Sequence, residues 1–241
     1  MRAPPPGLQP LGLPFFDRDP QVVAADLLGK VLGHWCGRRW LLAWLVETEA
    51  YYLDDKASHA SLGYTEKRRA LFMPPGTVYM YYARGGDSFN VSCRGAGNAV
   101  LIKAGLPYLD GPGARGMPAA MQMRNPLPSG TPREPGRLCT GQTLLCRSLG
   151  LKVPDWDGRA VTAPGLLLAD AGYRPRQVVR ARRLGIPQGR DGHLPYRFVD
   201  AGRAAHSTRN PLTQRGAGRV VEAFSPPQDA RAWERLLRPQ H

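Results

Sequence analysis

Two carboxylates and a phenol lie at alternate positions, at the end of the most apolar stretch of the chain. Glu47, Glu49 and Tyr51 follow residues 40–45, which read Trp-Leu-Leu-Ala-Trp-Leu. Side chains alternate along a strand, so these three are predicted to line one face. Burying carboxylates costs free energy, and a catalytic cleft is one common reason why a protein accepts that cost. The pair could bind a metal, act in acid–base hydrolysis or form ion pairs; the motif alone favours ion pairs.

The chain is strongly basic. Lys and Arg number 33 against 19 Asp and Glu, which gives a formal net charge of +14. Such an excess is typical of a protein that meets a polyanion, and nucleic acid is the leading partner. Only five of the basic residues are Lys, a bias that a GC-rich genome can produce. That bias explains the preference for Arg over Lys, but it does not explain why basic residues outnumber acidic ones.

Cysteine and histidine usage predicts no structural metal. The four cysteines form no Cys-x-x-Cys pair, and the five histidines do not complete a zinc site. The N-terminus has no apolar core of a signal peptide, and no run approaches the ~18 apolar residues of a membrane span. We therefore expect a cytoplasmic protein with reduced thiols and no membrane contact.

The elements that must position the acidic motif are those of an α+β fold. A helix is predicted at about 20–28, because Asp19 can cap it, Pro20 suits its first turn and Gly29 follows its end. One domain is expected over residues 11–238, with residues 1–10 disordered and one curved, mainly antiparallel sheet flanked by helices. Strands are predicted at 31–35, 40–51, 78–82 and 99–104 and near 160–161, 177–181 and 197–199, and further helices after Thr65 and near 118–123, 141–149 and 230–237.

Other segments show a more specific pattern. His59 follows Tyr51 by eight residues, residues 71–81 read Leu-Phe-Met-Pro-Pro-Gly-Thr-Val-Tyr-Met-Tyr, and residues 90–92 read Asn-Val-Ser. With Glu-Thr-Glu-Ala-Tyr at 47–51, they resemble the alkyladenine (3-methyladenine) DNA glycosylase family, vertebrate-type enzymes that also occur in bacteria. The resemblance extends over most of the chain, through residues 11–16, 138–141 and 195–198.

The resemblance implies a role for each matched residue. Glu49 would be the general base that activates water for attack on the sugar C1′ of a flipped-out nucleotide. Tyr51, His59 and Tyr81 would sandwich the extruded base, and Asn90 would crowd the 2-amino group of undamaged guanine. The expected enzyme is a monofunctional glycosylase that needs no cofactor or metal. It would act as a monomer on double-stranded DNA and remove damaged purines such as 3-methyladenine, 7-methylguanine or hypoxanthine.

Three further residues on these strands carry expectations of their own. Glu47 is interpreted as structural, and Tyr79, on the same strand face as Tyr81, as a core residue. Lys103 stands where the family usually has Arg; it can still orient water and carboxylate, but it lacks the forked geometry of Arg. An amine near C1′ also raises the hypothesis of Schiff-base lyase activity.

The second departure from the family lies in the hairpin expected at the DNA-binding face. The family inserts a Tyr into the minor groove, whereas residues 82–87 here read Tyr-Ala-Arg-Gly-Gly-Asp. Our hypothesis is that Arg84, or Tyr82 with a shifted hairpin, fills the gap left by the flipped base; a plain tight turn is the alternative. The competing functions are a non-catalytic nucleic-acid-binding module of the same fold and, ranked last, a metal-dependent nuclease using Glu47 and Glu49.

Overall fold

The fold is taken from a computed structural model, in which residues 3–83, 85–110, 114–227 and 230–237 are described. Its α-helices are α1 (Pro20–Asp26), α2 (Met117–Arg124), α3 (Gln142–Leu149), α4 (Val153–Trp156) and α5 (Ala230–Leu237). Short 3-10 helices are η1 (Leu13–Phe15), η2 (His59–Leu62), η3 (Glu66–Phe72), η5 (Pro135–Arg137) and η6 (Ala201–His206). The strands are β1 (Gln9–Pro10), β2 (Lys30–Cys36), β3 (Arg39–Tyr51), β4 (Val78–Ala83), β5 (Gly86–Ser92), β6 (Ala99–Pro107), β7 (Leu166–Asp170), β8 (Val178–Ala181), β9 (Arg197–Asp200) and β10 (Val220–Phe224).

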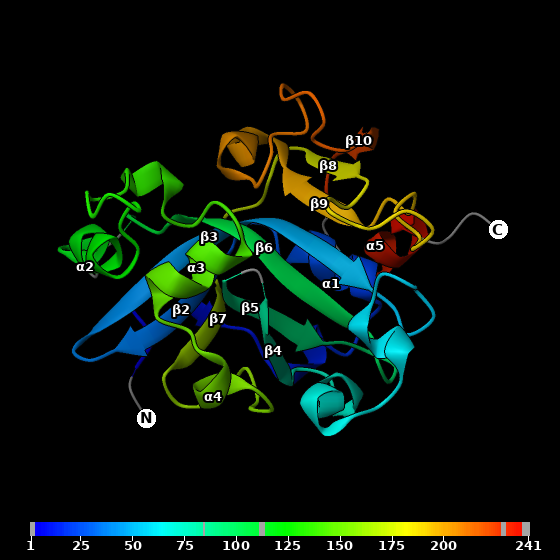
Figure 1. Cartoon of the computed structure of the whole chain (residues 1–241), viewed down its shortest axis with the longest axis horizontal. Coiled ribbons are helices and arrows are strands. Elements are labelled where there is room, and N and C mark those ends of the chain that lie inside the picture. The colour runs from blue at the N-terminus through cyan, green and yellow to red at the C-terminus, as the bar shows by residue number, and fades with distance from the viewer. Residues whose placement is uncertain (1–2, 84, 111–113, 228–229, 238–241) are drawn as a thin grey trace.

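These strands join in one antiparallel sheet. Its main path runs β1-β7-β2-β3-β6-β5-β4. One edge of β3 pairs with β2 over residues 39–44 and with β9 over residues 47–49, and β8 and β10 continue the sheet from β9 as a branch. The branch lies beside α5 and η6, away from the β4–β5 end of the sheet (Figure 1). The open sheet flanked by helices confirms the α+β prediction.

Strand β3 lies at the centre of this arrangement. It is buried from Trp40 to Ala50, and it pairs with β2, β6 and β9. The register with β6 shifts on both sides of Glu47 and passes over Lys103. Such bulges bend a strand and redirect a side chain, which gives Lys103 an irregular place in the ladder.

The two faces of β3 have different neighbours. Helix α1 packs on one face, where the Thr48 hydroxyl donates to the Ala24 carbonyl at 2.7 Å. Because side chains alternate, Glu49 faces the other side, against which α3 packs through β5 and β6. Within residues 47–51, Thr48 therefore faces the apolar core under α1, and Glu49 faces the opposite side of the sheet.

Local signals in the sequence explain several of these elements. Helix α1 begins as predicted, since the Asp19 side chain accepts from Gln21 N at 2.8 Å and Pro20 follows it. The segment 160–161 forms only an isolated bridge between Thr77 and Ala160. Strands β1, β5, β7 and β10 were not predicted.

The N-terminal segment packs against the sheet over the residues that are described. Leu8 is buried, and Gln9 and Pro10 pair with β7. The indole of Trp40 donates to the Ala3 carbonyl at 3.3 Å. Residues 3–10 are thus placed by contacts with the body of the fold, and among the described helices none is long and apolar enough to cross a membrane.

Candidate active site

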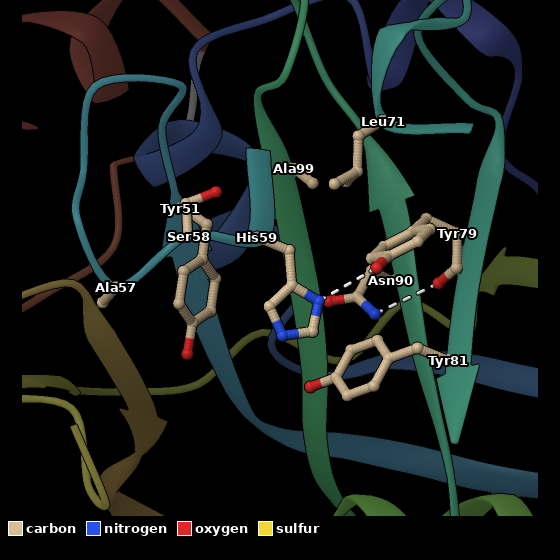
Figure 2. A pocket seen from close by; sticks show the side chains of 9 residues that line it. All are labelled: Tyr51, Ala57, Ser58, His59, Leu71, Tyr79, Tyr81, Asn90 and Ala99. Carbon is tan, nitrogen blue, oxygen red and sulfur yellow. Dashed lines mark hydrogen bonds between the residues drawn. The ribbon is translucent and has the colours of Figure 1, made fainter. Parts of the chain in front are cut away.

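A pocket with aromatic walls opens where β3 ends and β4, β5 and η2 meet. Tyr51 stands on one side of it, and His59 and Tyr81 stand on the other (Figure 2). The rest of the lining consists of Ala57, Ser58, Leu71, Tyr79, Asn90 and Ala99. The pocket therefore brings together four residues predicted from widely separated segments: Tyr51, His59, Tyr81 and Asn90.

The wall opposite Tyr51 is a packed cluster of rings. The centroids of His59 and Tyr81 lie 4.5 Å apart with an interplanar angle of 60°, and those of Tyr79 and Tyr81 lie 5.6 Å apart. His59 Nδ1 and the Tyr79 hydroxyl are 2.9 Å apart, within hydrogen-bonding distance. Burial, with added repulsion from Arg68 and Arg190, lowers the pKa of His59 below its ordinary value of 6.5. The imidazole is therefore neutral at pH 7.

Asn90 forms the inner end of the pocket. It is 6% exposed, and its side-chain nitrogen donates to the Tyr79 carbonyl at 3.1 Å. Asn90 pairs with Leu101 across β5 and β6, and Leu101 pairs with Glu49 across β6 and β3. Two strand spacings, roughly 10 Å, thus separate Asn90 from Glu49 along one row of the sheet.

Glu49 is fully buried and contacts Tyr51 and Lys103, two residues whose side chains line the neighbouring cavities. Its Oε2 accepts a hydrogen bond from the Tyr51 hydroxyl at 2.7 Å, and its Oε1 lies 3.4 Å from Lys103 Nζ. Oε1 has no hydrogen-bond partner among the described residues. Burial first, and then the Glu49 charge, raise the pKa of Tyr51 far above its usual value, so the phenol keeps its proton and donates it.

A second, more open cleft adjoins the aromatic pocket. It shares Tyr51, Ala57, His59 and Tyr81 with that pocket and adds Lys103, Gln142, Arg190 and residues 184–187. Gln142, the first residue of α3, donates to the Ser88 hydroxyl at 2.7 Å. This outer cleft gives the aromatic pocket an entrance that is bordered by cations.

The second carboxylate of the motif is held away from this cleft. Glu47 Oε1 accepts from Arg197 Nε at 2.7 Å, and its Oε2 accepts from Thr208 N at 2.6 Å. Both side chains of the Glu47–Arg197 pair are fully buried. Removing one partner of such a pair leaves an uncompensated buried charge, so Glu47 has the structural part that the sequence indicated.

The hairpin residues are placed differently. Tyr82 is 68% exposed, and by alternation along β4 it lies on the face opposite Tyr79 and Tyr81. Arg84 lies outside the described residues. The pairing of β4 with β5 extends to Ala83 and Gly86, and a Cβ on Gly86 would come within 2.0 Å of the Thr143 side chain.

Some contacts around the pocket were not predicted from the sequence. Tyr79 is buried as expected, but its hydroxyl also contacts His59. Arg183 and Asp55 form a buried ion pair beside Tyr51. No local signal could have found this pair, since 128 positions separate the two residues. Among the described residues, no group of three or more His, Cys, Asp or Glu side chains could hold a metal ion.

An aromatic pocket next to a buried carboxylate is the kind of site that can hold a planar ring while a bond to it is hydrolysed. Residues 14–204 match the family model of methylpurine-DNA glycosylase. The chain belongs to this family, which confirms the resemblance seen in the sequence and places the chain among the DNA glycosylases.

Individual relatives agree with the family match. A Pseudomonas aeruginosa (strain UCBPP-PA14) protein named "Putative 3-methyladenine DNA glycosylase" is 60% identical over 86% of this chain and 87% of its own length. Proteins with the same name from Pseudomonas savastanoi pv. phaseolicola and Koribacter versatilis are 58% and 34% identical, over 84% and 81% of this chain and 92% and 91% of their own lengths.

Proposed function

We propose that this protein removes alkylated or deaminated purines, of the 3-methyladenine, 7-methylguanine and hypoxanthine type, from double-stranded DNA. It hydrolyses the N-glycosidic bond with a water that Glu49 activates, and it leaves an abasic site without using a cofactor. The observation that carries the proposal is the row of the sheet in which Asn90 and Glu49 lie roughly 10 Å apart, with the aromatic pocket between Tyr51 and His59 beside it.

Base flipping accounts for the aromatic walls. A purine inside a duplex hides its glycosidic bond, and extruding it costs a few kcal/mol. Stacking on aromatic side chains returns ~1 to 3 kcal/mol per contact, so Tyr51 on one side and His59 with Tyr81 on the other can offset extrusion. Electron-rich ring faces also attract the positive charge of an N-methylated purine.

The chemical step follows from the surroundings of the carboxylate. Glu49 Oε1 has no hydrogen-bond donor of its own among the described residues, so it can accept the proton of a water. The water oxygen bonds to C1′ while the C1′–N bond breaks, and the bonding electrons leave with the base. Tyr51 holds Oε2, and Lys103 at 3.4 Å orients the carboxylate and the water by its charge.

Selection of damage belongs to the inner end of the pocket. Asn90 is buried and tied to the Tyr79 carbonyl, so its amide cannot move freely out of the way of a purine 2-amino group. Undamaged guanine carries that group and hypoxanthine does not. 7-Methylguanine carries it as well, but its positive charge, which the ring faces attract and which makes it a better leaving group, offsets the crowding. Crowding at Asn90 is thus a way to reject guanine by an unfavourable contact.

The protein is proposed to bind duplex DNA as a monomer in the cytoplasm, with the β4–β5 hairpin at the minor groove. Arg84, or Tyr82 with a shifted hairpin, would fill the gap that the flipped base leaves. Tyr82 is exposed, as a wedge requires, and it lies on the face of β4 opposite Tyr81.

The direct test is release of free base from duplex oligonucleotides that each carry one lesion, with 7-methylguanine, hypoxanthine and undamaged guanine compared. We expect release of the two lesions, no release of guanine, and strands that stay intact until alkali is added. A non-catalytic module of the same fold would bind these duplexes and release nothing, and that result would overturn the proposal.

A further inference from the structure

A buried guanidinium lies directly behind the aromatic pocket. The Arg183 side chain is fully buried, and its Cζ lies 4.5 Å from the centroid of the Tyr51 ring. Its Nη1 donates to the carbonyl of Ala50 at 3.1 Å. Arg183 does not line the aromatic pocket, so the face of Tyr51 that it covers is the face turned away from the pocket. Only the other face is left for a base.

The same guanidinium holds the loop that carries the opposite wall. Asp55 is buried with Arg183 in an ion pair, in which Nη2 donates to Oδ1 at 2.9 Å and Nη1 donates to Oδ2. Asp55 in turn accepts from Ala57 N at 3.0 Å through Oδ1 and from Ser58 N at 2.8 Å through its carbonyl. The Ser58 hydroxyl then caps η2, the helix that begins with His59.

We propose that Arg183 is a positioning residue that sets the separation between Tyr51 and His59, and so determines whether a flipped purine can stack between them. It bonds to the end of β3 on one side and, through Asp55, to the turn before η2 on the other. The inference rests on the proposed function, because it assigns the aromatic pocket to a flipped base.

The shape of the guanidinium suits this task. One planar fork reaches both Asp55 oxygens and the Ala50 carbonyl while its plane covers the Tyr51 ring. Lysine keeps the charge but has no fork, so it cannot make these contacts together. Arg183→Lys is therefore expected to weaken the contacts that hold the two walls of the pocket in place, while the positive charge at this position is kept.

The chain offers a closely matched control. Arg18 also pairs with a carboxylate, Asp26 at 3.0 Å, donates to a backbone carbonyl, Phe15 at 2.8 Å, and lies over an aromatic ring, 4.2 Å from the Phe15 centroid. It lies just before α1, on the face of the sheet opposite the pocket. Arg18→Lys loses the same kinds of contact without touching either wall.

The experiment compares Arg183→Lys, Asp55→Asn and Arg18→Lys with the unchanged protein. Single-turnover release is measured on a hypoxanthine duplex, and affinity is measured on the same duplex, in a Glu49→Gln background, and on a duplex with a tetrahydrofuran abasic analogue, which has no base to stack. We expect Arg183→Lys and Asp55→Asn to lower release and hypoxanthine-duplex affinity roughly 10- to 100-fold, since misplacement by about 1 Å can cost that much. Affinity for the analogue duplex should stay within about twofold, because sugar and phosphate contacts remain.

Two results would overturn this inference. One is an equal loss of affinity for the hypoxanthine and the analogue duplex, which indicates a general structural defect. The other is a loss of release in Arg18→Lys as large as that in Arg183→Lys. If the unchanged protein released no base at all, the proposed function would fail, whereas the affinity comparison of the two duplexes would still test the pocket.

Discussion

At the scale of single residues, the two oxygens of Glu49 have different surroundings. Oε2 is held by the Tyr51 hydroxyl, and Oε1 faces Lys103 without a hydrogen bond. Tyr51 thus takes part twice in the proposed reaction, with its ring face toward the base and its hydroxyl on the general base. Tyr51→Phe would keep the first role and lose the second, so the two roles can be separated.

His59 should make the choice of lesion depend on pH. Burial lowers the pKa of His59 below its ordinary value of 6.5, so the ring is neutral at pH 7 and becomes a cation only at a lower pH. A cationic ring repels a cationic N-methylated purine but not neutral hypoxanthine. We expect the ratio of 7-methylguanine release to hypoxanthine release to fall as the pH is lowered from 7 to 5.

The matched control for this dependence is His59→Gln, which cannot titrate. Its ratio should stay flat over the same pH range in single-turnover assays. A ratio that falls equally in the unchanged protein and in His59→Gln would show that another group is responsible.

Lys103 is expected to act by its charge and not as a nucleophile. Its Nζ forms an ion pair with Glu49, and an ammonium group has no lone pair with which to attack C1′. Borohydride treatment of the protein with abasic DNA should therefore trap no covalent complex, and Lys103→Arg, which keeps the cation, should keep base release. A trapped complex that disappears in Lys103→Arg would instead reveal lyase activity.

At the scale of elements, the β4–β5 hairpin is the part of the proposed DNA interface with the clearest test. Arg84→Ala should slow release from duplex DNA by roughly 10-fold or more, because a flipped base returns faster to an unfilled stack. Release from single-stranded DNA should change little. Tyr82→Ala tests the other candidate, an exposed ring that would fill the gap if the hairpin shifts. If both variants excised bases from duplex DNA at the unchanged rate, the hairpin would have no wedge.

The elements also show how far local sequence leads. Alternation along residues 47–51 was enough to predict that Glu49 and Tyr51 share a face, and their hydrogen bond confirms it. Strand β5 was missed because Gly86, Asp87 and Ser88 have low strand propensity, and they are held instead by contacts with α3 and Lys152. Tertiary packing overrides propensity there.

Ion pairs between residues far apart in the sequence set a second limit on what the sequence can predict. The pairs Arg183–Asp55 and Arg197–Glu47 join residues 128 and 150 positions apart, so no spacing rule can predict them. The resemblance to a family found the residues that would touch the base, but not the buried charges that hold those residues in place.

At the scale of the whole molecule, the net charge of +14 predicts how binding depends on salt. If 6 to 10 phosphates are contacted, DNA affinity should fall by ~10³ to 10⁵ between 50 and 200 mM salt, because binding releases counterions. Arg190→Gln, at the outer cleft, should reduce the slope of log affinity against log salt by about 1. A flat salt response in the unchanged protein would contradict the phosphate interface.

The most direct test of the central claim is single-turnover base release by Glu49→Gln, measured beside its affinity for the same lesion duplex. The amide keeps the shape of the side chain but cannot take a proton from water. A positioned general base typically contributes 10² to 10⁴ in rate, so release should fall by about that factor while affinity stays close to that of the unchanged protein. Release at the unchanged rate would contradict the assignment of Glu49 and the mechanism built on it.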